Sequence, residues 1–180
     1  TLWTNLVGSA GFDYSKDIAI DSNGYIYITG RTDENLDGQV NNGSNDAFIS
    51  KFDSNGSKLW TRLIGGKNND ESYGIAINAS GNIYITGFTQ DNLDGQVNNG
   101  NNDIFISKFD SDGSKLWTRL IGENLGDNGR KIKISKEGAI YIAGLTSNHL
   151  NNQINLGSSD AFIISLQDLI STSSNDNLLG

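Results

Sequence analysis

The sequence predicts an all-β protein in which one four-stranded antiparallel unit is repeated three times. A strand-like stretch at residues 24–30 returns at 81–87 and 138–144, with an offset of 57 residues each time. Its Ile and Tyr residues alternate between two glycines, which favours a strand because successive side chains point to opposite faces. We expect the glycines to end this strand. Self-similarity at a fixed spacing indicates an array of one structural unit.

Each unit contains four strand-like runs joined by polar turns. The turns are rich in Asp, Asn, Ser and Gly, which suits short hairpin connections. Consecutive antiparallel strands with short turns form a meander. The four runs of the first unit lie at residues 2–8, 18–20, 24–30 and 46–52, and each returns at the same offset.

Composition excludes several classes of protein. The 180 residues carry a formal net charge of −8 and include no Cys, no Met and no Pro. This negative charge argues against nucleic acid, whose phosphates it would repel. No apolar run reaches about 18 residues, so we expect no membrane insertion. Without Cys there is no disulfide framework and no thiol nucleophile. The absence of Met leads us to expect a piece of a longer polypeptide.

The repeated units occupy residues 1–168, which we predict to form one domain. Residues 169–180 are polar and Ser-rich, which is typical of a linker or tail. Their last part, 174–180, is similar to the lead-in of the glycine- and aspartate-rich calcium repeats of secreted bacterial proteins.

The order of residues in each unit resembles the SBBP-type β-propeller repeat. The features that carry the resemblance are the run Asp-Ala-Phe-Ile-x-Lys-Phe-Asp from Asp46, the Leu59-Trp60 pair, the Gly65-Gly66 pair and the Ile-Tyr-Ile-Thr-Gly stretch. The resemblance implies a four-stranded blade for each unit. It also implies membership of large bacterial, especially cyanobacterial, surface or secreted proteins. It implies no particular chemistry, because propellers host binding, scaffolding and catalysis alike.

Three units are few for a propeller, since closed rings have about four to eight blades. The family suggests that the run from Asp46 is the innermost strand of its blade. The chain would then close with an innermost strand at 160–166, the missing partner of the first blade. We therefore hypothesise a homodimer that forms a six-bladed ring, in which each chain lends its last strand to the other. Two alternatives stay open: a longer parent chain that supplies further blades, and a compact three-fold barrel of the β-trefoil type.

Polar side chains in the long segment of the first unit have the spacing of a calcium loop. A tight turn of this kind points carboxylate and carbonyl oxygens at a hard cation such as Ca²⁺. The alternative is an ordered turn in which Asp and Asn side chains satisfy their own backbone. The candidate ligands are Asp33, Asn35, Asp37, Gln39 and Asn41 in the first unit, and with less charge Asn92, Asp94 and Asn98 in the second.

An apolar pair in the same segment, Leu36 with Val40, recurs in all three units. The pair persists in the third unit, where the acidic residues are absent. We therefore expect both side chains to hold the loop on the core whether or not a metal binds.

The other repeated residues favour structural roles. Asp13 and Asp46 recur in every unit, and a repeated acid more often holds a turn than acts in catalysis. Tyr27 and Trp60 lie inside alternating runs, so we expect them and their copies in the core between blades. His149 is the single histidine and has no nucleophile motif beside it. We predict that the protein is not an enzyme.

These observations favour a non-catalytic, lectin-like binding or adhesion module, secreted or on the bacterial cell surface. Repeated loops on one rim would present equivalent sites to a glycan or protein ligand, so that several weak contacts act together. Phe12 and Tyr14 offer aromatic surface in the first unit. The alternative function is a ligand-free structural or assembly module, stabilised by calcium and strand exchange.

Overall fold

The computed structural model describes residues 2–168, which form eleven strands and no helix that could cross a membrane. The predicted tail at 169–180 lies outside the described residues. The strands are β1 (Asp13–Ile20), β2 (Ile26–Thr32), β3 (Asp46–Phe52), β4 (Lys58–Ile64), β5 (Asp70–Ile77), β6 (Ile83–Thr89), β7 (Asp103–Phe109), β8 (Lys115–Ile121), β9 (Asp127–Ile134), β10 (Ala139–Thr146) and β11 (Asp160–Gln167).

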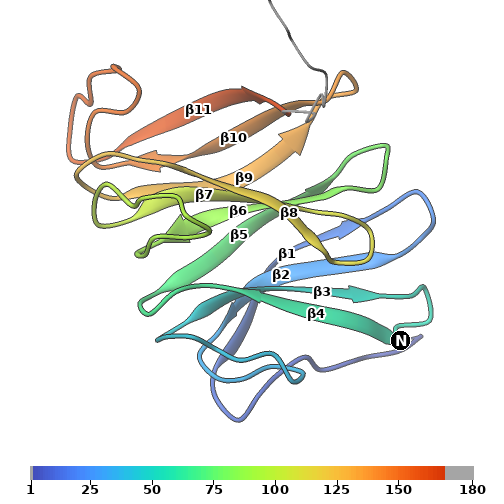
Figure 1. Ribbon diagram of the computed structural model, residues 1–180. Helices are drawn as coiled ribbons and strands as arrows, with labels where there is room; N and C mark the ends of the chain where they lie inside the picture. The colour runs from blue at the N-terminus through green and yellow to red at the C-terminus, as the bar shows by residue number, and fades with distance from the viewer. Residues whose placement is uncertain (1, 169–180) are drawn as a thin grey trace, which may run out of the picture.

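Consecutive strands pair antiparallel in three sheets, which we call blade 1 (β1–β4), blade 2 (β5–β8) and blade 3 (β9–β11). Figure 1 shows the blades stacked in chain order, with blade 1 at the bottom and blade 3 at the top. The all-β class and the meander of each unit are thus confirmed. Three separate stacked sheets differ from the single barrel of the β-trefoil alternative.

The strand order corrects the predicted phase of the repeat. β5 packs against β1 of blade 1, and β9 packs against β5, so these first strands are the innermost of their blades. The run from Asp46 is β3, the third strand of a complete sheet. The prediction that residues 160–166 supply a missing innermost strand was wrong, because β11 already pairs with β10 of its own blade. Both runs alternate in the same way, so alternation alone could not distinguish an inner strand from a third one.

The predicted first strand, residues 2–8, pairs with no other strand in the described chain. Its copies β4 and β8 each pair with the strand that precedes them, and residues 2–8 follow no such strand. The segment instead lies against blade 1, where Asn5 Nδ2 donates to the carbonyl oxygen of Gly56. The ring of Trp3 covers the same glycine.

Two apolar clusters fill the spaces between the blades. Between blades 1 and 2, Tyr27 and Ile49 pack with Ile75, Ile85 and Phe105. Residues 57 positions further along form much of the second cluster, between blades 2 and 3. Each buried Ile or Phe side chain of this kind contributes about 1.5–3 kcal/mol to the free energy of unfolding. The second cluster includes Tyr84, Ile106, Ile132 and Ile142.

The aromatic residues of the repeat belong to this core, as predicted. Tyr27 meets the edge of Trp60 with ring centroids 6.1 Å apart, and Tyr84 meets Trp117 in the same way at 6.2 Å. Both tyrosines are fully buried. The copies at the two ends of the stack depart from this expectation. Tyr141 in blade 3 is 40% exposed and Trp3 is 43% exposed, because no further blade covers them in the described chain.

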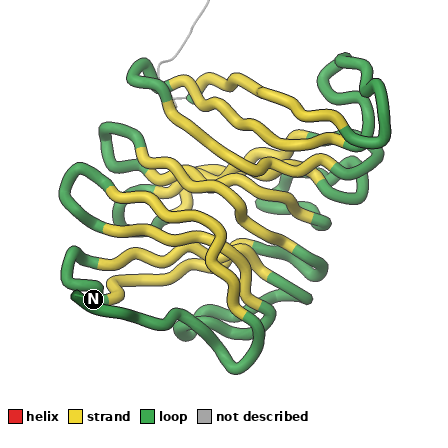
Figure 2. The backbone as a smooth tube through the Cα atoms, turned by 180° about the vertical axis from the view of Figure 1, so that it is seen from behind, coloured by secondary structure: helices red, strands yellow, loops and turns green. Residues whose placement is uncertain are grey.

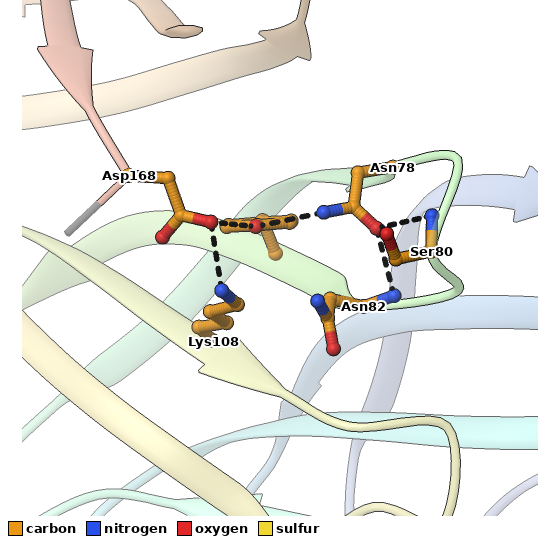
Figure 3. A network of polar contacts seen from close by, with 6 residues as sticks. Asn78, Ser80, Asn82, Lys108 and Asp168 are labelled. Atoms are coloured by element: carbon orange, nitrogen blue, oxygen red, sulfur yellow. Dashed lines mark hydrogen bonds and ion pairs between the residues drawn. The ribbon is translucent and has the colours of Figure 1, made fainter. Parts of the chain in front are cut away.

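A polar network ties the end of blade 3 to blade 2 (Figure 3). Asp168 Oδ2 accepts hydrogen bonds from Tyr84 Oη and from Lys108 Nζ, each at 2.7 Å. Asn78 Nδ2 donates to the same tyrosine hydroxyl at 3.1 Å, and its Oδ1 accepts from the backbone N–H of Asn82 at 3.0 Å. Burial opposes ionisation of Asp168, but Lys108 and Tyr84 hold its pKa below the usual range.

A bulge in each innermost strand requires a glycine in the next strand. The register of β5 with β6 shifts between Ser72 and Gly74, which leaves Tyr73 as the extra residue. A Cβ at Gly87, opposite the bulge, would overlap the backbone carbonyl of Glu71. Gly30 and Gly144 occupy the same place in blades 1 and 3. These glycines lie inside their strands, so the expectation that they end the run was wrong.

We expect Gly87→Ala to lower the free energy of unfolding by about 1–3 kcal/mol, because the backbone must shift to admit the methyl group. Chemical denaturation followed by tryptophan fluorescence measures this. Gly157→Ala is the matched control, since nothing lies within 4 Å of its Cβ position. Equal stabilities of the two variants would contradict the role given to the bulge.

Candidate ligand-binding site

The loops and turns gather at the two ends of the strands, as Figure 2 shows. One end carries the long segments 33–45, 90–102 and 147–159, which we call the rim loops. The opposite end carries the short hairpin turns. The predicted calcium ligands all lie in the first two rim loops.

Each rim loop contains a tight turn with left-handed backbone. Leu36 and Gln39 exchange backbone hydrogen bonds of 3.1 and 2.9 Å around Asp37 (φ 52°) and Gly38 (φ 76°). Positive φ at both central residues is the mark of a type I′ turn. In the third loop Asn151 and Asn152 take these places with φ of 49° and 63°, which Asn tolerates better than most residues.

The five candidate ligands of the first loop turn to separate partners. Asp33 Oδ1 accepts from the N–H of Phe12 at 2.6 Å, and Asn35 Oδ1 accepts from the N–H of Asn41 at 2.9 Å. Asp37 pairs with Lys58 Nζ and accepts from Thr61 Oγ1. Gln39 contributes the backbone bonds of the turn, and Asn41 Nδ2 donates to Thr32 O at 3.1 Å.

The second loop repeats this pattern. Asn92 Oδ1 accepts from the N–H of Asn98 at 2.8 Å, and Asp94 pairs with Lys115. Among residues 2–168 no three acidic or His side chains cluster as metal ligands would. The lysine at Asp37 and at Asp94 supplies the positive charge that a cation would otherwise bring. These bonds account for the loops as ordered turns, and calcium binding stays a prediction.

The apolar pair of the rim loop divides between core and solvent. Leu36, Leu93 and Leu150 are buried, as expected. Val40 is 65% exposed and its copies are similarly exposed, so the expectation that both residues anchor the loop was wrong for this position. Three residues separate the two positions on either side of the type I′ turn, and the turn directs the second side chain outward.

The recurring aspartates hold turns, as the sequence indicates. Each accepts a hydrogen bond through Oδ2 from the backbone N–H of the residue four positions earlier. The second oxygen of most of them, Oδ1, is buried without a partner among the described residues. The hydrogen bonds run from Ser9 to Asp13, Asn42 to Asp46, Gly66 to Asp70, Asn99 to Asp103, Glu123 to Asp127 and Leu156 to Asp160, over 2.6–3.1 Å.

Burial of these carboxyl groups makes their charged form costly. It raises the pKa of Asp70 from 3.8 to about 6, with further contributions from the nearby Asp91 and Asp46 carboxylates. Burial likewise raises the pKa of Asp46, Asp103 and Asp127. The blade junctions thus carry acidic groups that keep their protons more tightly than exposed carboxyl groups do.

A second group of polar residues lies on the innermost strands and on the neighbouring β2 and β6, beside the rim loops. We call it the axial cluster. It is centred on the bulged residues of β1, β5 and β9, which are Lys16, Tyr73 and Arg130. Its members are Tyr14, Lys16, Arg31, Glu71, Tyr73, Phe88 and Arg130.

Ion pairs and cation–π contacts join the axial cluster across the blades. Lys16 Nζ lies 2.9 Å from Glu71 Oε1, and Arg31 Nε lies 3.6 Å from the same oxygen. The guanidinium carbon of Arg31 is 4.9 Å from the Tyr14 ring centre, and that of Arg130 is 4.1 Å from the Tyr73 ring centre. The cluster therefore contains three cations, two tyrosine rings and one buried carboxylate, which pairs with Lys16 and Arg31.

A comparison of the three units at equivalent positions could have drawn attention to this cluster, whereas a search for repeated residues could not. Residues 36–66 and 93–123 differ at only four positions. At the axial positions, in contrast, the units carry unrelated residues. Tyr14 corresponds to Glu71 and Asn128, and Lys16 corresponds to Tyr73 and Arg130. Recurrence therefore points to residues that every unit needs, whereas the residues of the axial cluster differ from unit to unit.

We expect Asp70→Asn to stabilise the protein at pH 7–8 by about 1–3 kcal/mol. The pKa of Asp70 is raised in the folded state. Its carboxyl group therefore contributes fully to the free energy of unfolding only below about pH 3.8, and this contribution is lost as the pH rises towards 6. The gain from the substitution should therefore shrink as the pH falls below 5.

Thermal unfolding of both proteins from pH 4 to pH 8 measures this effect. Asp112→Asn is the control, because Asp112 is exposed and Asn55 stands at the same place in blade 1. A pH-independent difference between Asp70→Asn and the parent would contradict the buried-carboxyl account.

Comparison with known proteins gives one family and one relative. The SBBP β-propeller repeat matches residues 2–37 and 59–94. The regulatory protein FlaEY of Caulobacter vibrioides is 26% identical over 135 residues, which span 71% of this chain and 14% of that protein. The matched region is thus a small part of a much longer relative.

The two family matches start 57 residues apart, which is the offset of the internal repeat. Each match begins in the Trp-bearing run, crosses the loop to an innermost strand and ends in the type I′ turn of a rim loop. The resemblance inferred from the sequence is confirmed, because residues 2–37 and 59–94 each match the SBBP β-propeller repeat.

Proposed function

We propose that this chain is a non-catalytic binding module that holds a carboxylate-bearing ligand at the axial cluster. The observation that carries the proposal is the concentration of unit-specific charged and aromatic residues there, whereas residues 36–66 and 93–123 differ at only four positions. Residues needed by every blade recur, so residues that differ between blades serve something that the repeat itself does not need.

The charge of the cluster favours an anionic ligand. The whole chain has a net charge of −8, yet the cluster pairs Lys16 and Arg31 with Glu71 and adds Arg130 over the Tyr73 ring, so that it holds three cations and one carboxylate. The Lys16 and Arg31 side chains remain about one-third exposed. A ligand carboxylate can therefore reach the guanidinium group of Arg31, whose planar fork suits bidentate binding.

The aromatic residues favour a ligand with a flat or apolar face. Tyr14 is 43% exposed, and Phe12 stacks on it with ring centroids 6.5 Å apart. A sugar ring can pack on such a surface while its acid group meets the cations. An acidic glycan combines both features, and an acidic peptide shares the carboxylate.

A non-catalytic role is consistent with how the reactive side chains are used. The single histidine, His149, accepts a hydrogen bond from the N–H of Asn155 at 3.0 Å and so holds the third rim loop. Glu71 is paired with two cations, which suits positioning rather than proton transfer. A secreted or cell-surface location is part of the proposal and rests on the family resemblance.

The second candidate function is a structural or assembly module without a ligand. Its specific support is the pair of apolar blade faces that remain exposed at the two ends of the stack. The cations of the axial cluster would then serve only to pair blades.

We expect Arg31→Gln to weaken binding of an acidic oligosaccharide about 10- to 100-fold, since one charge-assisted hydrogen bond contributes about 1.5–3 kcal/mol. Glu71 keeps Lys16 as its partner in this variant, so the fold should persist. Titration calorimetry with polygalacturonate fragments at low and high salt measures binding, with a poly-glutamate peptide as the second arm.

Lys136→Gln is the control, because this exposed lysine lies in a hairpin turn and its substitution removes the same charge. Binding of neither ligand by the parent protein, with Arg31→Gln equally stable, would favour the ligand-free module. Equal loss in both variants would indicate attraction by net charge alone.

The calcium prediction has a separate test. We expect removal of Ca²⁺ by EDTA to lower the unfolding temperature of the parent protein if the first rim loop binds the ion. Asp33→Asn should abolish that shift, whereas Asp112→Asn should not. An unfolding temperature that does not change with EDTA or added Ca²⁺ would remove calcium from the function.

A further inference from the structure

The interface between blades is made twice within the chain from equivalent residues. One side of it is the forward face of a blade, with Tyr27 and Ile49 in blade 1 and Tyr84 and Ile106 in blade 2. The other side is the rear face of the next blade. The rear face carries Ile75 and Ile85 in blade 2, and Ile132 and Ile142 in blade 3.

The two halves of a third copy of this interface are exposed at the ends of the stack. On the forward face of blade 3, Ile163 is 76% exposed, whereas its counterparts Ile49 and Ile106 are fully buried. On the rear face of blade 1, Ile18 is 61% exposed, whereas its counterparts Ile75 and Ile132 are buried. The chain therefore exposes one forward face and one rear face, and faces of these two kinds pack on each other at both internal interfaces.

The segment at residues 2–8 lies where the fourth strand of a preceding blade belongs. In the interior, Arg62 of β4 donates to the carbonyl oxygen of Gly113 in the next blade at 3.0 Å, and Trp60 covers that glycine. Asn5 and Trp3, at the same positions of the repeat, make the same contacts with Gly56. Residues 2–8 thus occupy the position of the fourth strand of a blade that would pack on the rear face of blade 1.

Blade 3, in turn, lacks a fourth strand among the described residues. Within the described residues it has three strands, and β11 pairs with β10 along one edge only. β3 and β7 at the same position each pair with a fourth strand that matches residues 2–8 in sequence. An unpaired strand edge is a template for a further strand.

We propose that the forward face of blade 3 binds the rear face of blade 1 in a second copy of this chain. Residues 2–8 of the second copy then pair with the free edge of β11 as the fourth strand of that blade. Such an interface joins different surfaces of the two copies, so it closes only if the rotation it imposes completes a ring. Two copies with three blades each form a ring of six, within the usual range of about four to eight blades.

The proposed interface lacks two polar contacts that the internal ones have, which indicates a weaker contact. Lys51 donates to Ser111 O across the first junction at 2.8 Å, and Lys108 pairs with Asp168 across the second. Ser165 stands at this position in blade 3 and cannot reach as far. The Ser50–Thr61 side-chain bond of 2.8 Å is also lost, because Ile164 replaces the serine. A dimer that dissociates on dilution is therefore expected.

Sedimentation of the 180-residue chain tests the proposal first. We expect a mass of two chains at roughly micromolar concentration and above. Ile163→Asp should weaken the dimer by roughly 100-fold or more, because a charge would enter an apolar contact. Ile154→Asp should leave the dimer unchanged. Ile154 is similarly exposed at 71%, and its counterparts Val40 and Val97 are exposed in the other units as well.

A cysteine pair tests the register, and the chain has no native cysteine to interfere. Asn45 and Asn69 form a parallel bridge across the first junction, as Asn102 and Gly126 do across the second. At the proposed junction the same positions are Ser159 and, in the second copy, Phe12. Neighbours in such a bridge have Cα atoms close enough for a disulfide, about 4.4–6.8 Å apart.

We expect Phe12→Cys/Ser159→Cys to give one covalent dimer on oxidation, and each single variant to give none. If oxidation instead gives a series of higher covalent oligomers, the copies join in an open chain and the closed ring is wrong. A sedimentation mass of one chain at up to roughly 100 μM, with no covalent dimer, would overturn the proposal. In that case further blades of the same polypeptide would cover the two exposed faces. Neither readout depends on the ligand proposed for the axial cluster.

Discussion

Packing of one sheet face on the next is the constraint on which this structure depends. Every blade has two faces that carry Ile, Tyr and Phe, and a sheet with two apolar faces must be covered on both. Blade 2 satisfies this requirement, because Ile83 and Ile85 on one face and Tyr84 and Ile106 on the other are fully buried. Blades 1 and 3 satisfy it on their inner faces only.

Local features of the fold could be predicted from the sequence because local rules determine them. Alternation of Ile and Tyr identified β2, β6 and β10, and Asp-Gly pairs marked turns with left-handed backbone. The role of Gly30 could not be seen in this way. In the sequence this glycine stands at the end of an alternating run. In the structure it lies inside β2, and glycine is required there because the backbone carbonyl of Tyr14 comes too close for a Cβ atom.

The features that failed prediction depend on partners far away in the chain. Residues 2–8 have the sequence of β4 and β8, yet a strand exists only when another strand pairs with it. The phase of the repeat failed for the same reason. The runs that begin with Asp13 and Asp46 both alternate, and only the approach of β5 to β1 and β9 shows which run is innermost.

Repetition also explains why the sequence directs attention to the rim loops, where calcium binding stays a prediction. A residue that occurs in every unit solves a problem that every unit has. Asp70 holds its turn, Gly87 admits a bulge, and Asp94 shapes a type I′ turn while it pairs with Lys115. Selection for a ligand acts on one place in the assembled protein, so its residues differ from blade to blade. The residues of the axial cluster differ between the blades, whereas ten of the thirteen rim-loop positions are the same in the first two units.

The proposed assembly and the proposed ligand site share the innermost strands. Lys16 of blade 1 pairs with Glu71 of blade 2, and one repeat further on these positions hold Tyr73 and Asn128. At the proposed junction between copies the same positions hold Arg130 and the Tyr14 of the second copy. The junction would therefore bring a cation to an aromatic ring, as Arg130 and Tyr73 already do within the chain. Two axial clusters would then border one axis, and a ligand long enough to reach both would gain affinity from their effective concentration.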